Sequence, residues 1–143
     1  MYGDNRIEIR RAFIDAWRKH REGEALSALE QIIADVVEQH PEYHRLLEDP
    51  DRALDQDFTP EGGATNPFLH MGMHISLIEQ IQTDRPGGIT DLYRRITINH
   101  GDAHTAEHAM MECLGRVLWE AQRANRPPDD TDYLDCLKRL ARG

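Results

Sequence analysis

Histidines spaced four residues apart are the feature of this chain best suited to chemistry. Eight histidines occur in 143 residues. Three pairs share the spacing, and the last continues to a carboxylate: His40/His44, His70/His74 and His104/His108/Glu112. Residues four apart on an α-helix project from one face, about 5–6 Å apart at Cβ, so two imidazoles can reach one metal ion. The spacing therefore predicts a metal site wherever these segments are helical.

The pair His70/His74 falls in the middle of an apolar helical stripe that also carries Leu77 and Ile81. A buried imidazole needs a partner for each ring nitrogen, and these stripes offer few serines or threonines to provide one. A metal ion satisfies one nitrogen of each ring, and a carboxylate or carbonyl satisfies the other. We therefore expect both histidines to be ligands.

The pair His104/His108 lies beside the apolar stripe of its segment rather than inside it, together with Gly115. Such a flank suits a helix with two neighbours, and the glycine would let one of them approach closely. We expect both histidines to join His70 and His74 as ligands. Either Glu112 or Glu107 would act as the carboxylate ligand or as a base.

The remaining histidines have two interpretations. His40 and His100 each complete an apolar stripe, and His44 follows His40 by one turn. A single buried histidine is more often a hydrogen-bonded core residue than a ligand. These three are therefore either additional ligands or groups that support the ligands, whereas His20 is expected to be structural.

Residues 104–108 read His-Thr-Ala-Glu-His, the HxxEH pattern of inverted zinc peptidases. In those enzymes the two histidines bind zinc and the glutamate, here Glu107, activates water. The peptidase fold is far larger than the chain around this motif, so a peptidase by homology is not expected. A metal-dependent hydrolase of independent design stays open, with Glu107 as its candidate base.

The donor set predicts the class of metal. Four imidazoles with few carboxylates favour zinc, iron or nickel, because magnesium and calcium prefer oxygen ligands. The residues alone leave the choice among the three open.

Composition narrows the class of protein. A net charge of −9 argues against a dedicated nucleic-acid binder, which usually carries a basic excess. No segment approaches the roughly 20 apolar residues of a membrane span, and the first residues lack the apolar stretch of a signal peptide. Cys113 and Cys136 form no CxxC motif, so we expect reduced thiols in a soluble, cytoplasmic protein. A protein partner or a second copy of the chain stays open.

Hydrophobic periodicity predicts helices nearly throughout and no strand. The predicted helices cover about residues 5–21, 25–39, 67–82, 89–99, 103–124 and 131–141, with a short one after Pro41. Asn66-Pro67 is a helix start signal, Gly101 is a stop signal, and Asp102 is the start signal of the following helix. The polar segment of about 49–65 predicts a long surface loop with one helical turn. The expected fold is all-α, a single-domain bundle of about five or six helices over residues 1–143.

Longer phrases of the sequence resemble a known family. AWRKHREG, HPEYHRLLEDP, TNPFLHMGMH and HGDAHTAEHAMMECLG look like a small bacterial family catalogued as domain of unknown function eighteen-forty-one. The resemblance covers the whole chain and implies no established catalytic residue. The paired histidine spacings also resemble those of hemerythrin-like di-iron proteins, as an analogy of spacing alone.

Three functions follow from these patterns. The first is a histidine-rich metal-binding helical bundle of unknown activity. The second is a non-catalytic helical adaptor, in which the histidines pack and hydrogen-bond and an acidic surface meets a partner. The third is the metal-dependent hydrolase.

Overall fold

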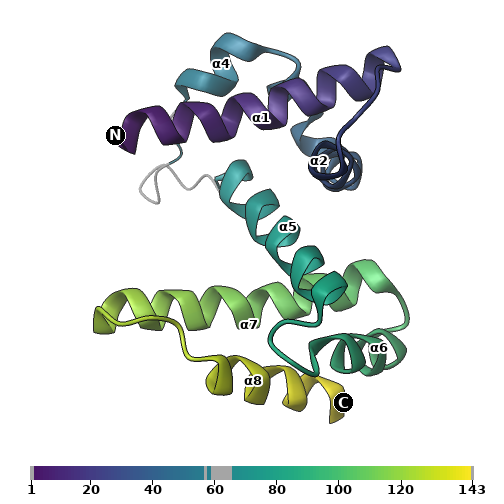
Figure 1. Ribbon diagram of the computed structural model, residues 1–143, viewed down its shortest axis with the longest axis vertical. Coiled ribbons are helices and arrows are strands. Elements are labelled where there is room, and N and C mark those ends of the chain that lie inside the picture. Colours follow the sequence, from purple (N-terminus) through teal and green to yellow (C-terminus); the bar gives the residue numbers. More distant parts are fainter. Residues whose placement is uncertain (1, 57, 59–65, 143) are drawn as a thin grey trace. The chain divides into compact units, whose positions relative to one another are not determined.

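The computed structural model describes residues 2–56, 58 and 66–142, and the side chains within these ranges from residue 7 onward (Figure 1). Over these residues the chain is helical and has no strand, as the periodicity predicts. It forms two compact units, 1–72 and 73–143. Helix α5 (Pro67–Thr83) gives its first turns to the first unit and the remainder to the second. One domain over residues 1–143 stays a prediction.

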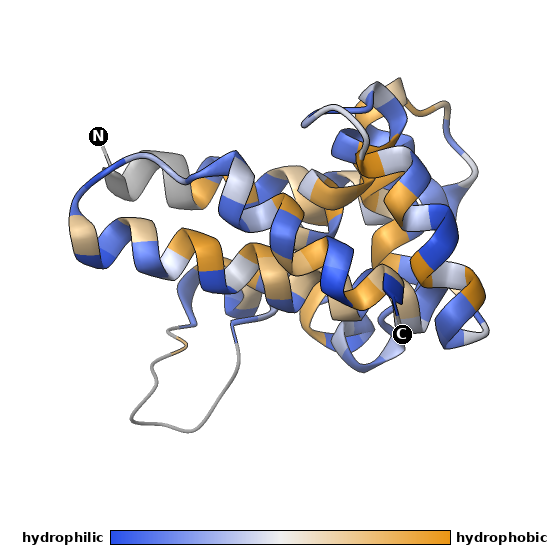
Figure 2. Ribbon diagram, turned by 90° about the horizontal axis from the view of Figure 1, so that it is seen from below, coloured by the Kyte–Doolittle hydropathy of each residue, from blue (hydrophilic) through white to orange (hydrophobic). Residues whose placement is uncertain are grey.

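In the first unit, α1 (Tyr2–Glu22) packs against α2 (Ala28–Glu38), α3 (His44–Leu47) and α4 (Pro50–Asp55). A single 3-10 turn, η1 (Pro41–Tyr43), lies between α2 and α3. Aliphatic and aromatic side chains from these helices and from the start of α5 form the core, among them Phe13, Trp17, Ile33, Val36, Val37, Leu47 and Phe68. Hydrophobic and hydrophilic residues alternate along the helices, as expected for amphipathic segments (Figure 2).

A capping box sets the start of α2. The Ser27 hydroxyl accepts a hydrogen bond from the Glu30 backbone N–H, and the Glu30 carboxylate accepts one from the Ser27 N–H. The helix therefore begins at Ala28, three residues later than the periodicity predicts. Asn66 and Asp102 cap α5 and the helix that begins at Ala103 as expected, because their side chains accept from the backbone N–H groups of Phe68 and Thr105.

Buried Arg10 holds α4 against α1. Its guanidinium donates to the backbone carbonyls of Ala53, Leu54 and Gln56, the last at 2.8 Å. The same group lies over the ring of Phe68, 4.8 Å from the centroid. A cation at a helix C-terminus satisfies the carbonyls that the helix leaves unpaired. The long-range contact explains how so short a helix persists.

In the second unit, α6 (Ile89–His100), α7 (Ala103–Ala124) and α8 (Asp130–Arg142) pack against one another (Figure 1). Their shared core includes Leu77, Ile89, Leu92, Ile96, Met110, Leu114, Val117, Tyr133 and Leu137. Gly101 ends α6 in the left-handed conformation, with φ of 87°. This is the stop that the sequence predicts, because glycine adopts that conformation without steric cost.

The cysteines differ from the prediction. Cys113 of α7 and Cys136 of α8 form a disulfide, with their Cα atoms 5.9 Å apart. The expectation of reduced thiols was therefore wrong. It rested on the missing CxxC motif, whereas the packing of α7 against α8 brings together two cysteines separated by 23 residues.

The helix count also differs. The described residues contain eight α-helices, not five or six. The segment after Pro41 forms both η1 and α3, and α4 lies inside the predicted loop of about 49–65. The part of that loop at 57 and 59–65 lies outside the described residues. Among the described helices, none combines the length and the apolar character needed to span a membrane.

Candidate metal centre

In the second unit, His74 of α5 is fully buried, at 0% exposure. Its position on the apolar stripe, with Leu77 one turn on, accounts for this burial. The imidazole Nε2 lies 2.5 Å from Glu107 Oε1 of α7. A carboxylate oxygen can only accept here, so Nε2 carries the proton. Glu107 thereby fixes both the tautomer and the orientation of the His74 ring.

Glu107 is held from a second side. The Tyr93 hydroxyl of α6 donates to Glu107 Oε2 at 2.8 Å. Burial would raise the pKa of the Glu107 carboxyl, but hydrogen bonds from His74 and Tyr93 outweigh it and leave the pKa below its ordinary value. Burial and the carboxylate together raise the pKa of Tyr93 to about 12. At neutral pH the network is an ionised carboxylate between two proton donors.

The rings of His104 and His108 lie near this network. The His74 ring centroid is 5.6 Å from that of His108 and 6.4 Å from that of His104. His104 and His108 lie 4.2 Å apart, edge to face. The structure thus brings together three of the four histidines expected as the main ligands.

The backbone fixes the tautomer of His108. Its Nδ1–H donates to the carbonyl of His104, one turn earlier, at 3.1 Å. In the neutral ring, Nε2 then carries the lone pair that can bind a metal. His100 has the same geometry, since its Nδ1–H donates to the Ile96 carbonyl at 3.0 Å.

Gly115 has the role expected from the sequence. A Cβ built at this position would lie 3.2 Å from Cε of Met73, tighter than ordinary contact. The glycine therefore allows the side chain of Met73, the residue before His74 in α5, to approach α7 closely.

In the first unit, the His70 ring meets that of His40. The two Nε2 atoms lie 3.1 Å apart, and the rings are edge to face. His40 is buried, and its Nδ1–H donates to the Val36 carbonyl at 2.7 Å. Tyr43 stacks on the His40 ring. Since His40 Nδ1 holds the proton, its Nε2 presents a lone pair toward His70.

The other candidates have different surroundings. His44 bonds to the Val37 carbonyl and packs on Trp17, which also stacks with His20. Glu112 is exposed on α7. Of the two carboxylates expected near the histidines, the described hydrogen bonds place Glu107 on His74.

Tyr93 was not expected in the centre, because the sequence places it on the apolar stripe of its helix. The available signal was its hydroxyl, since a tyrosine packed into a core needs a hydrogen-bond partner.

The structure also bears on the HxxEH motif, whose glutamate is Glu107. Both Glu107 oxygens already accept a hydrogen bond, so a role as base would have to use one of their remaining lone pairs.

Comparison with known proteins identifies a family and nothing more specific. No curated protein and no solved structure matches the chain, so the hemerythrin resemblance stays an analogy of spacing. A family model matches residues 5–139. The resemblance predicted from the phrases around the histidines is thereby confirmed: the chain belongs to the family described as Domain of unknown function (DUF1841).

Proposed function

We propose that this protein binds a transition metal, with His74, His104 and His108 as ligands in the second unit. The observation that carries the proposal is the support of His74, whose buried imidazole is held by a carboxylate that is itself held by Tyr93. Carboxylates on the outer nitrogen of a metal-binding histidine orient the ring and raise its basicity. The network supplies the supporting groups that such a ligand needs.

The ligand atoms of His108 and His74 follow from their hydrogen bonds. His108 would bind through Nε2, because its Nδ1–H is committed to a backbone carbonyl. His74 would bind through Nδ1, because Nε2–H is committed to Glu107. Glu107 then orients a ligand rather than serving as one. Exposed Glu112, one turn beyond His108 on α7, is the proposed carboxylate ligand.

The donor set selects zinc, iron or nickel. Imidazole nitrogens suit these ions, whereas magnesium and calcium require mostly oxygen ligands.

In the first unit, His40 and His70 form a second candidate ligand pair. Two nitrogens bound to one zinc ion at 2.0–2.1 Å, at N–Zn–N angles from about 90° to the tetrahedral 109°, are separated by about 2.8–3.4 Å. The 3.1 Å between their Nε2 atoms lies within this range, and it also fits a hydrogen bond between the rings.

A specific observation favours the helical adaptor as the second candidate function. His40, His44 and His100 each bond a backbone carbonyl, which is what a structural histidine needs. The adaptor function predicts that chelator leaves the contribution of each histidine to the stability of the protein unchanged. The metal-binding function predicts a chelator effect confined to the ligands.

The test combines elemental analysis with thermal unfolding. Protein purified without an affinity tag is analysed for zinc, iron and nickel, and is then unfolded with and without chelator. The variants are His108→Ala and, as the matched control, His100→Ala. Both residues are half-buried and bond the carbonyl one turn earlier, but His100 is not one of the proposed ligands.

We expect stoichiometric metal in the wild type and in H100A, with a melting temperature that falls when chelator is added. H108A should lose both the metal and the chelator effect. Sub-stoichiometric metal after growth with each of the three ions would overturn the proposal. A chelator effect that persists unchanged in H108A would overturn the ligand assignment.

A further inference from the structure

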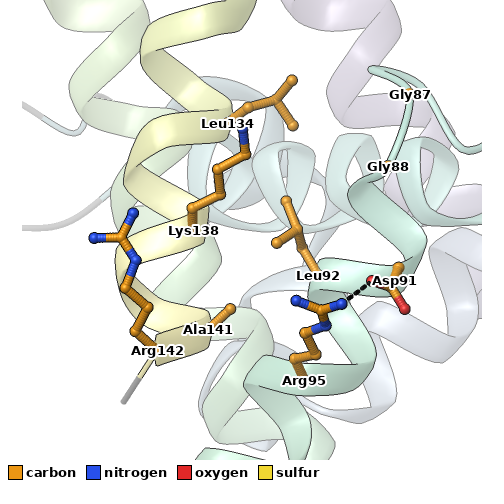
Figure 3. Close-up of a pocket in the computed structure, with 9 residues that line it drawn as sticks. All are labelled: Gly87, Gly88, Asp91, Leu92, Arg95, Leu134, Lys138, Ala141 and Arg142. Atoms are coloured by element: carbon orange, nitrogen blue, oxygen red, sulfur yellow. Dashed lines mark ion pairs between the residues drawn. The ribbon is translucent and has the colours of Figure 1, made fainter.

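A groove in the second unit lies between α6 and α8, with a volume of about 460 Å³ (Figure 3). Leu92 of α6 and Leu134 and Ala141 of α8 form its apolar lining. Its charged lining is basic in excess: Arg95 projects from α6, and Lys138 and Arg142 project from α8. A pocket of this size with an apolar floor and a few polar groups is typical of a small-molecule site.

The positive charges of the groove are only partly compensated. Asp91 pairs with Arg95 at 3.1 Å across one helical turn. Within the described part of the chain, Lys138 and Arg142 form no ion pair. They stand one turn apart on α8, where like charges repel. In a chain of net charge −9, this groove is therefore a local positive region.

The C-terminal dipole of α8 explains part of this charge, because cations near a helix C-terminus are stabilised. Arg139 shares that position on α8 but does not line the groove. Arg95 lies on a different helix, where the dipole of α8 does not account for it. The excess of positive charge is therefore a property of the groove and not only of the C-terminal end of α8.

We propose that this groove binds a small organic carboxylate. The carboxylate contacts Arg95 and Lys138, and its apolar body lies on Leu92 and Leu134. A guanidinium has five N–H donors, so Arg95 can hold Asp91 and a ligand carboxylate together. The apolar floor selects against a bare inorganic anion, which would gain nothing from it. This inference does not depend on metal binding by the histidines.

The test is an NMR titration of the full chain, in chelator-containing buffer, with octanoate as the probe. The readouts are the methyl resonances of Leu92 and Leu134. 1-Octanol is the neutral probe of matched length, and inorganic phosphate is the bare anion. The variants are K138Q and, as the matched control, R139Q, which removes the same charge from α8 outside the groove.

We expect octanoate to shift both leucine methyls in a saturable way, and 1-octanol or phosphate to bind at least tenfold more weakly. K138Q should weaken octanoate binding at least fivefold, whereas R139Q should change it less than twofold. Equal binding of 1-octanol or of phosphate would overturn the proposal. So would the absence of methyl shifts in the wild type, or equal weakening by both substitutions.

Discussion

The two units hold their histidines by different chemistry. In the first, buried His40 donates to a neutral backbone carbonyl and faces a second imidazole. In the second, buried His74 donates to an ionised carboxylate that Tyr93 also holds. A carbonyl fixes the tautomer of a ring without adding charge, whereas a carboxylate also stabilises positive charge on the ring or on a bound ion. We therefore expect the second unit to bind metal more tightly than the first.

The largest expected effect is that of His74→Ala. At a free zinc concentration a thousand times the dissociation constant, loss of the ion should lower the free energy of unfolding by about 4 kcal/mol. The lost packing and hydrogen bond should cost about 1–3 kcal/mol more. Denaturant unfolding with zinc and with chelator separates the two contributions. An equal loss in both buffers would mean that His74 is an ordinary core residue.

The disulfide should give the next largest effect, and it belongs to the second unit. Replacing Cys113 and Cys136 together by alanine opens a covalent loop and increases the conformational freedom of the unfolded chain. For a separation of 23 residues the cost is about 3 kcal/mol. Hydrogen exchange should report the loss at α7 and α8. Unchanged protection of these helices, in the variant or after reduction, would contradict the structural role of the disulfide.

In the first unit, the contact comparable to the disulfide is the one that Arg10 makes with α4. Arg10→Met keeps much of the apolar contact with Phe68 but removes the donors to the carbonyls at the end of α4. Hydrogen bonds from a charged group contribute about 1.5–3 kcal/mol, so we expect a loss of about 2 kcal/mol. Hydrogen exchange of the α4 amides should accelerate most. Arg11→Met, on the exposed face of α1, is the control and should leave α4 unchanged.

The smallest expected effect is the acid dependence of the capping box in the first unit. The ammonium of Lys19 and the hydrogen bonds of Ser27 lower the pKa of Glu30 to about 2. A lowered carboxyl pKa adds stability that is present above about 4.5, its ordinary value, and is lost as the pH falls toward 2. In Glu30→Gln the stability of α2 should depend less steeply on pH in this interval. An unaltered slope would show that Glu30 contributes nothing there.

Local sequence signals predicted most of the fold. The helices that carry His70/His74 and His104/His108 begin and end close to the expected residues, because caps such as Asn66 and Asp102 act on their own first turns. From the sequence, α4 was expected only as one helical turn within a loop, and the disulfide was missed, for a shared physical reason. Arg10 is more than 40 residues from the carbonyls it binds, and Cys113 and Cys136 meet only through helix packing.

In the candidate centre, too, local spacing could be predicted from the sequence and contacts between helices could not. Helical spacing placed His104 and His108 together and placed His74 on a buried face. Spacing within one helix cannot tell which carboxylate of a neighbouring helix meets a histidine, so Glu107 and Glu112 stayed open. The contribution of Tyr93 from α6 depends on the packing of α6 against α7, which no local pattern encodes.

The histidines of the second unit are proposed to bind metal through particular ring nitrogens. Long-range ¹H–¹⁵N NMR of the imidazoles, recorded before and after one equivalent of zinc, tests this proposal most directly. We predict that zinc shifts His108 Nε2 and His74 Nδ1 while the opposite nitrogens keep their protons, and that His100 stays unchanged. Ring nitrogens of His74, His104 and His108 that show no shift with zinc would contradict the account.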